Sequence, residues 1–133
     1  MTDGKDMRLS CQSPKHIRAD LLETFPYQGP SQTITYTSRE FSAVCPFSGL
    51  PDVATVEIIY IPDEKCLELK SLKLYFVSYR NVGIYQEHAT QRIFEDLKTV
   101  ISPRYLKITT RYATRGGIDA ECCIESDHAD SCA

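Results

Sequence analysis

The sequence has no long hydrophobic run, no excess of basic residues and no paired cysteines. No stretch approaches the roughly 18 consecutive apolar residues that a membrane-spanning helix requires, so we expect no membrane contact. Residues 1–16 are polar and lack the apolar segment of a secretory signal peptide, which predicts a cytoplasmic protein. The net charge of −3 argues against direct nucleic-acid binding through a broad basic surface.

The six cysteines lack the C-x2-C spacing that is typical of structural zinc sites. Cys122, Cys123, His128 and Cys132 form a loose cluster near the C-terminus, but their intervals do not match a zinc site either. We therefore predict no metal. Because a cytoplasm is reducing, the cysteines are expected to be mostly free thiols.

Hydrophobic residues make up 42% of the chain and charged residues 25%, a composition typical of one globular domain. We expect an irregular segment at residues 1–30, a single domain at 31–125 and a polar tail at 126–133. Within the domain, β-branched and alternating patterns predict strands, and apolar residues at helical spacing predict helices. The strands are expected at residues 32–37, 53–61, 106–112 and 118–124, with 40–44 leading into a loop, and the helices at 67–76 and 85–101.

The resulting order, β-β-α-α-β-β, predicts an α+β fold in which a four-stranded antiparallel sheet carries two helices on one face. A sheet of this size leaves its outer strands with unpaired backbone groups. Such edges tend to be hidden by association with neighbouring chains, so we expect a homo-oligomer.

The segment CPFSGLPD, residues 45–52, places a thiol and a carboxylic acid at the two ends of a short, stiff loop. Cys45 follows an apolar strand end and precedes Pro46, where the chain must turn, so its thiol could be exposed. A stabilised thiolate is a good nucleophile, and a partly desolvated Asp52 could supply a proton beside it. From spacing alone, a core cysteine and a turn aspartate remain the alternative interpretation.

A second cluster lies on the predicted helix 67–76. Its members are Glu68, Lys70, Ser71, Lys73 and Tyr75. Lys70 and Lys73 are three residues apart and share a helix face, where two ammonium groups and a hydroxyl could hold a phosphate. A solvated amphipathic face is the alternative.

Two shorter motifs can each be interpreted either as part of a binding site or as purely structural. Arg115 precedes Gly116 and Gly117, where a guanidinium and backbone N–H groups could meet a phosphate, or form a plain hairpin turn. Residues 85–88, YQEH, begin a helix, where an acidic side chain also complements the helix dipole.

The order of these segments resembles a known family. CPFSGLPD, ELKSLKLYF, SYRN, QEH and TRGG follow one another as in the unimodular QueF enzymes, the NADPH-dependent 7-cyano-7-deazaguanine reductases of queuosine biosynthesis. The resemblance runs from Phe41 to about Ile124. Within it, residues 68–75, ELKSLKLY, match the family signature E-[SL]-K-[SA]-x-K-[LY]-[YFW], which separates the reductases from related GTP cyclohydrolases.

This resemblance implies the tunnelling fold (T-fold), whose β-β-α-α-β-β subunits build barrels and bind purine- or pterin-like rings between subunits. It implies a pentamer, or two stacked pentamers. It also implies that Cys45 attacks the nitrile carbon to form a thioimide while Asp52 protonates the nitrogen. NADPH would supply hydride twice, to give 7-aminomethyl-7-deazaguanine.

The resemblance also implies roles for binding residues. Glu87 would accept hydrogen bonds from the guanine-like edge of the substrate. The remaining substrate contacts would come from Gln86, His88, Glu68 and the backbone of Leu67 and Leu69. The cofactor contacts would come from Lys70, Ser71, Lys73, Tyr75, Arg115 and Gly116. Many family members carry histidine where this chain has Gln86, which puts an acid–base role at that position in doubt.

Three other functions remain open on the same residues. An amidinotransferase that adds ammonia to the nitrile in transfer RNA would keep the cysteine and the aspartate but lack the cofactor signature. A cyclohydrolase-like enzyme would need zinc, and no suitable spacing surrounds Cys45. A non-catalytic purine-binding module would need neither Cys45 nor Asp52.

Overall fold

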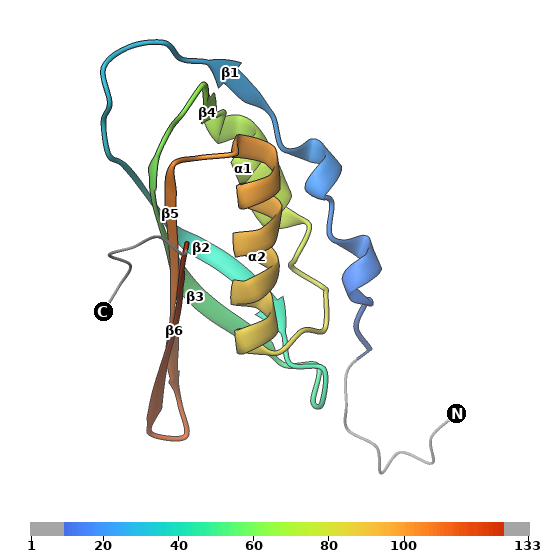
Figure 1. Ribbon diagram of the computed structural model, residues 1–133. Coiled ribbons are helices and arrows are strands. Elements are labelled where there is room, and N and C mark those ends of the chain that lie inside the picture. Colours follow the sequence, from blue (N-terminus) through green and yellow to red (C-terminus); the bar gives the residue numbers. More distant parts are fainter. Residues whose placement is uncertain (1–9, 127–133) are drawn as a thin grey trace, which may run out of the picture.

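A four-stranded antiparallel sheet forms one layer of the protein, and two helices cover one of its faces (Figure 1). The computed structural model describes residues 10–126. The sheet has the order β2 (Ile34–Val44), β3 (Pro51–Ile61), β5 (Tyr105–Arg115) and β6 (Ile118–Glu125). The predicted α+β class and the antiparallel sheet with its helical layer are therefore confirmed.

The predicted strand at residues 32–37 and the segment 40–44, predicted to lead into the loop, belong to one strand. The polar residues Ser38 and Arg39 lie between the two predicted segments. In the structure β2 continues through this point, and its register against β3 shifts between Ser38 and Phe41. A bulge lets a strand continue while an irregular stretch passes without a matching partner.

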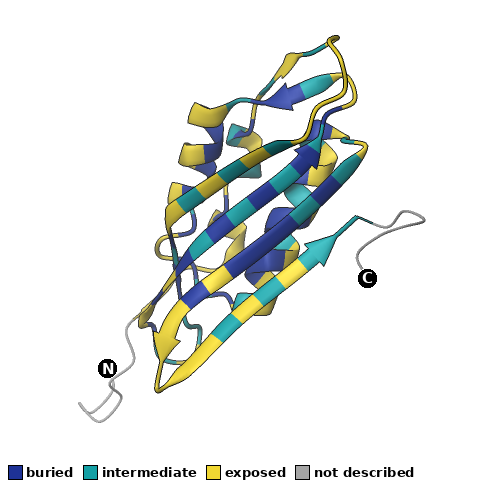
Figure 2. Cartoon of the chain, turned by 90° about the vertical axis from the view of Figure 1, so that its left-hand side faces the viewer, coloured by how far each residue is buried: buried dark blue, intermediate teal, exposed yellow. Residues whose placement is uncertain are grey.

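The strand β3 turns alternate residues toward the helices, as the striping of its buried positions in Figure 2 shows. On β3 the buried residues are Asp52, Ala54, Val56, Ile58 and Tyr60. Four of these are ordinary core residues. Asp52 is a carboxylic acid at the end of an otherwise apolar row, and this marks the place where the core gives way to a polar site.

The helix α2 (Gln86–Ile101) agrees with the predicted range of 85–101 to one residue. Ala89, Ile93, Leu97 and Ile101 are fully buried at helical spacing and hold it on the sheet. The helix ends at Ser102, which has a left-handed conformation (φ 47°), directly before Pro103.

The helix α1 (Leu69–Val77) begins two residues later than predicted. Glu68 caps it, because its carboxylate accepts the N–H groups of Lys70 and Ser71 at 2.9 and 2.8 Å. Leu67 belongs to a short strand, β4 (Lys65–Leu67), which pairs with β1 (Thr24–Pro26). Neither strand is predicted by the sequence, since three residues are too few to show a period.

The segment before β1 lies along α1 and carries two 3-10 helices, Pro14–His16 and Ala19–Leu21. Two serines hold it there, one within α1 and one at the C-cap of the helix. The hydroxyl of Ser71 accepts the N–H of Glu23 at 2.9 Å, and that of Ser78 accepts the N–H of Arg18 at 3.0 Å. No helix among residues 10–126 has the length and apolar character needed to cross a membrane.

Between the two helices, the chain passes beside the end of β2. Val44 forms a parallel bridge with Gly83, and on the other side Gln12 forms one with Val82. A side chain at Gly83 would collide with the sulfur of Cys11, so the side chain of Cys11 would have to move to make room for it. The arrangement braces the end of β2 where the CPFSGLPD loop begins.

Candidate active site

The CPFSGLPD loop folds back on itself and presents Cys45. The N–H of Cys45 donates to the carbonyl of Leu50 at 2.8 Å, and the N–H of Gly49 donates to the carbonyl of Cys45 at 2.7 Å. Gly49 has a positive φ of 75°, which glycine adopts without strain. These bonds fix the backbone of the cysteine on both sides, so its thiol has a defined direction.

The thiol of Cys45 is half-buried and lies close to backbone N–H groups of its own loop. Hydrogen bonding from the N–H of Ser48 is the largest influence and lowers the pKa of Cys45 below its ordinary value, although partial burial acts against it. The charge of Asp52 opposes the shift by raising the pKa of Cys45. The predicted thiol and acid are therefore brought into electrostatic contact.

Strand pairing brings Cys45 and Asp52 close together. Asp52 is directly opposite Ala43 in the β2–β3 ladder. Cys45 directly follows Val44, the last residue of β2, so the thiol lies beside the end of β3 that carries Asp52. Asp52 is only 8% exposed, and this burial raises the pKa of its carboxyl group.

Arg115 lies on the other side of Asp52. Its Nη1 forms an ion pair with Oδ1 of Asp52 and also donates to the carbonyl oxygen of Pro51 at 3.1 Å. The positive charge opposes the effect of burial and lowers the pKa of Asp52. Gly116 and Gly117, both with positive φ, close the hairpin behind it. Arg115 was predicted to bind a phosphate; in the structure its partner is the candidate acid.

Tyr112 is a site residue that sequence reasoning missed. Tyr112 is on β5 and lies opposite Ala54 of β3, which makes it a diagonal neighbour of Asp52 on the buried face. Burial is the main cause that raises the pKa of Tyr112, and the charges of Cys122, Asp52 and Glu87 add to it in decreasing order. Glu87, predicted to bind substrate, therefore acts electrostatically on the same tyrosine as Asp52.

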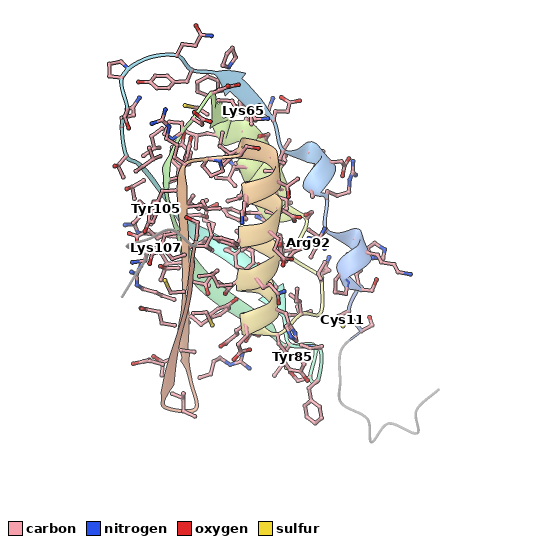
Figure 3. All side chains as sticks on the ribbon, viewed as in Figure 1. Cys11, Lys65, Tyr85, Arg92, Tyr105 and Lys107 are labelled. Carbon is pink, nitrogen blue, oxygen red and sulfur yellow. The ribbon has the colours of Figure 1, made fainter. Side chains whose placement is uncertain are left out.

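A cavity of about 490 Å³ adjoins the loop through Pro46 and runs along α2. Tyr85 and His88 line it, with ring centroids 6.3 Å apart, and Arg92 lies one turn further on. Figure 3 shows Tyr85 at the start of α2 and Arg92 further along the helix, with Cys11 on the N-terminal segment beside them. His88 faces this cavity, whereas Gln86 and Glu87 are absent from its lining.

A second cavity of about 490 Å³ lies between β2 and α1. Lys73, one of the predicted cofactor residues, lines it together with Arg39 and Arg80. Leu69 also belongs to its wall. The two arginines could not be assigned from the sequence, because they are far from Lys73 in the chain and only the packing of α1 on β2 gathers them. Glu40 also lines the groove, so three cations outnumber one anion there, and the remaining positive charge fits a phosphate group.

The other residues of the ELKSLKLY signature hold α1 in place. Tyr75 is fully buried, and its hydroxyl donates to Asp96 of α2 at 2.6 Å and contacts the hydroxyl of Tyr79 at 2.7 Å. Ser71 is buried, and its hydroxyl donates to the carbonyl of Glu68 at 2.7 Å. Lys70 is exposed, while Leu67 is buried in β4.

No three histidine, cysteine, aspartate or glutamate side chains gather as a metal site within residues 10–126. In the predicted C-terminal cluster, Cys122 and Cys123 lie on β6 as free thiols, and His128 and Cys132 lie outside the described residues.

Fold and site together define an α+β enzyme in which a thiol of lowered pKa lies beside a buried carboxyl group, an arrangement suited to covalent catalysis. The chain belongs to the QueF-like family, described as "QueF-like protein", whose family model matches residues 51–131. It is 56% identical over 103 residues to the NADPH-dependent 7-cyano-7-deazaguanine reductase of Thermotoga petrophila, covering 77% of this chain and 75% of the relative.

A second curated relative and a solved structure are also similar to this chain. The NADPH-dependent 7-cyano-7-deazaguanine reductase of Thermoanaerobacter pseudethanolicus is 46% identical over 121 residues, 89% of this chain and 91% of the relative. The crystal structure of the archaeosine synthase QueF-Like in the apo form superimposes with a TM-score of 0.66 at 26% identity. The match covers 77% of this chain and all of that chain.

Proposed function

We propose that this protein is an NADPH-dependent nitrile reductase that converts 7-cyano-7-deazaguanine to 7-aminomethyl-7-deazaguanine in queuosine biosynthesis. The observation that carries the proposal is the pair formed by Cys45, whose thiolate is stabilised by its loop, and the buried acid Asp52. The names of the similar reductases support the same chemistry.

The first step joins substrate and protein. The sulfur of Cys45 attacks the nitrile carbon, one bond of the C≡N triple bond is converted to a lone pair on nitrogen, and Asp52 gives that nitrogen its proton. The product is a thioimide on Cys45 and an ionised Asp52. When bound, NADPH supplies the hydride for each of the two following reductions.

The substrate ring is placed by the residues that surround Tyr112. We infer that the carboxylate of Glu87 accepts hydrogen bonds from the guanine-like edge, and that the ring lies near Tyr112 with its nitrile toward Cys45. Glu87 and Asp52 both act on Tyr112, so a single flat ligand could reach from one carboxyl group to the other. The half-buried Gln86, the exposed His88, and Glu68 with its neighbours Leu67 and Leu69 stay predicted as outer contacts.

The cofactor phosphates are assigned to the groove between β2 and α1. Lys73, Arg39 and Arg80 line it, and Lys70 is exposed on the same helix. We infer that Ser71 and Tyr75 serve the cofactor by fixing the orientation of α1, because both are buried and hydrogen-bonded within the chain. Arg115 and Gly116 remain candidates for a phosphate contact, although Arg115 first has to leave Asp52.

The complete site requires more than one chain. The groove of Lys73 and the loop of Cys45 share no lining residue in the described part of the chain. The outer strands β2 and β6 each pair with a neighbour on one side only. We propose that copies join through these edges into a T-fold barrel, pentameric or decameric, so that the groove of one copy meets the thiol of another.

The test is incubation of the protein with 7-cyano-7-deazaguanine in the absence of NADPH, followed by intact-mass spectrometry. We expect one adduct equal to the mass of the nitrile on the wild-type chain and none on Cys45→Ala. Cys123→Ser, which removes an exposed thiol of β6, is the matched control and should keep the adduct. Absence of the adduct from the wild-type protein at saturating nitrile would refute the covalent mechanism.

A second candidate function is the amidinotransferase reaction on the nitrile in transfer RNA. It is favoured by the structural likeness to the archaeosine synthase QueF-Like. The adduct test does not separate the two, since both begin with a thioimide. Stoichiometric oxidation of NADPH on addition of the free nitrile identifies the reductase, and product formation that needs ammonia and transfer RNA identifies the alternative.

A further inference from the structure

The ion pair between Arg115 and Asp52 occupies one oxygen of the acid. Nη1 of Arg115 binds Oδ1 of Asp52 and the carbonyl of Pro51. The guanidinium is 45% exposed and the carboxyl group 10%, so the arginine reaches the buried acid from the solvent side. A proton on Oδ1 would face a cation. The remaining oxygen, Oδ2, is therefore the site where a proton on Asp52 is stable.

Other charged and titratable groups near Asp52 disfavour its negative charge. Cys45 follows β2, Tyr112 lies beside Asp52 on β5, and Glu87 reaches the same neighbourhood from α2. Burial penalises the charge of Asp52 and is the largest cause that raises its pKa. A thiolate at Cys45 and the carboxylate of Asp52 repel each other, whereas the charge of Glu87 acts on Tyr112. Arg115 is the cation that directly contacts the group.

Thioimide formation needs one proton on the pair formed by Cys45 and Asp52. With two protons, the sulfur is a thiol and a weak nucleophile; with none, the nitrile nitrogen receives no proton. With one, sulfur attacks carbon, the proton moves from the pair to nitrogen, and Asp52 is left ionised. Thioimide formation is therefore fastest between the pH at which the pair loses its first proton and the pH at which it loses its second.

We propose that Arg115 is a positioning residue which binds Oδ1 of Asp52, so that the Cys45–Asp52 pair holds a single proton on Oδ2 or on sulfur at neutral pH. The role of Arg115 in catalysis rests on the proposed function. The ion pair between Arg115 and Asp52 is observed independently of that function. Removing the cation lets the pair keep both protons to a higher pH, and it shifts both limits of the working range upward.

The test compares Arg115→Gln with Arg115→Lys, which keeps the charge. Arg111→Gln is the matched control, since Arg111 is on the same strand and pairs with Glu57 and Glu121 instead. Carbon-13 NMR of the Asp52 carboxyl group is followed against pH without substrate, and adduct formation is timed across the same range. We expect both profiles to shift upward in Arg115→Gln, to return toward the wild-type position in Arg115→Lys and to stay in place in Arg111→Gln.

An Asp52 titration that is unmoved in Arg115→Gln overturns the inference, whether or not an adduct forms. A uniform loss of rate with unchanged inflection points would also overturn it, because that is the signature of a merely structural role. If the titration moves but the wild-type protein forms no adduct, the proposed function fails while the effect of Arg115 on Asp52 is established.

Discussion

At the scale of single residues, Cys45 and Asp52 differ from other cysteines and aspartates by their surroundings. The N–H of Ser48 stabilises the thiolate of Cys45, whereas burial destabilises the carboxylate of Asp52. The two environments push the two pKa values toward each other. A pair of groups with converging pKa values can exchange one proton at little cost, which is what a nucleophile and its acid need.

Asp52→Asn separates the two roles of this acid. The amide keeps the shape but has no acidic proton, so we expect substrate binding to persist while turnover falls by about 10²–10⁴-fold. The variant also lacks the negative charge that raises the pKa of Cys45. The pH midpoint of Cys45 alkylation by iodoacetamide should therefore move down. Near-normal turnover would remove Asp52 from the mechanism, and an upward midpoint would contradict its electrostatic role.

At the scale of secondary-structure elements, α1 and α2 are joined by a buried polar network. The hydroxyl of Tyr75 donates to Asp96, which also accepts Nε of Arg92 at 2.7 Å. Tyr79 contributes its hydroxyl to the same cluster. Since α1 carries Lys73 and α2 carries Glu87, the network sets the position of the cofactor groove relative to the substrate residues.

Tyr75→Phe tests whether the last position of the ELKSLKLY signature acts through this network. The variant leaves the buried hydroxyl of Tyr79 without this partner and removes the hydrogen bond to Asp96. We expect a loss of about 1–3 kcal/mol in the free energy of unfolding, measured by urea denaturation. Tyr85→Phe, at a half-exposed position, should change it by less than about 0.5 kcal/mol. Unchanged stability with a raised KM for NADPH would instead show direct contact of Tyr75 with the cofactor.

At the scale of the whole molecule, several apolar side chains of the described residues lie on the surface and are not covered by the rest of the chain. Leu69, Leu74 and Val77 are exposed on α1 beside the basic groove, and Ile118 is 70% exposed on the edge strand β6. Apolar side chains at a sheet edge and along an adjoining helix favour association between copies. A shared active site would make catalysis depend on that association.

Mixing two inactive variants tests the shared site. Cys45→Ala lacks the nucleophile and Lys73→Ala lacks a cation of the groove. If each site takes the thiol from one copy and the groove from another, oligomers formed by co-expressing both variants contain some intact sites and recover NADPH-dependent activity. Each variant expressed alone is the control. No recovery in verified mixed oligomers would show that a single chain holds both parts.

The prediction of elements was accurate where a pattern is long, and incomplete where it is short. The range 85–101 has four turns of regular spacing, and the observed helix differs from it by one residue. The pairing of β1 with β4 involves three residues on each side and is invisible in the sequence. The start of α1 was misplaced because Leu67 is apolar like the helix core, although it belongs to a strand.

The sequence by itself determined the long elements, their apolar faces and the presence of a thiol and an acid on one stiff loop, because these follow from periodicity and from chain neighbours. Only the tertiary structure decided which charges act on that acid. Arg115 and Tyr112 reach Asp52 across the β3–β5 ladder, and Arg39 and Arg80 meet Lys73 where α1 packs on β2. Electrostatic effects depend on distance in space, which residue spacing along the chain does not give.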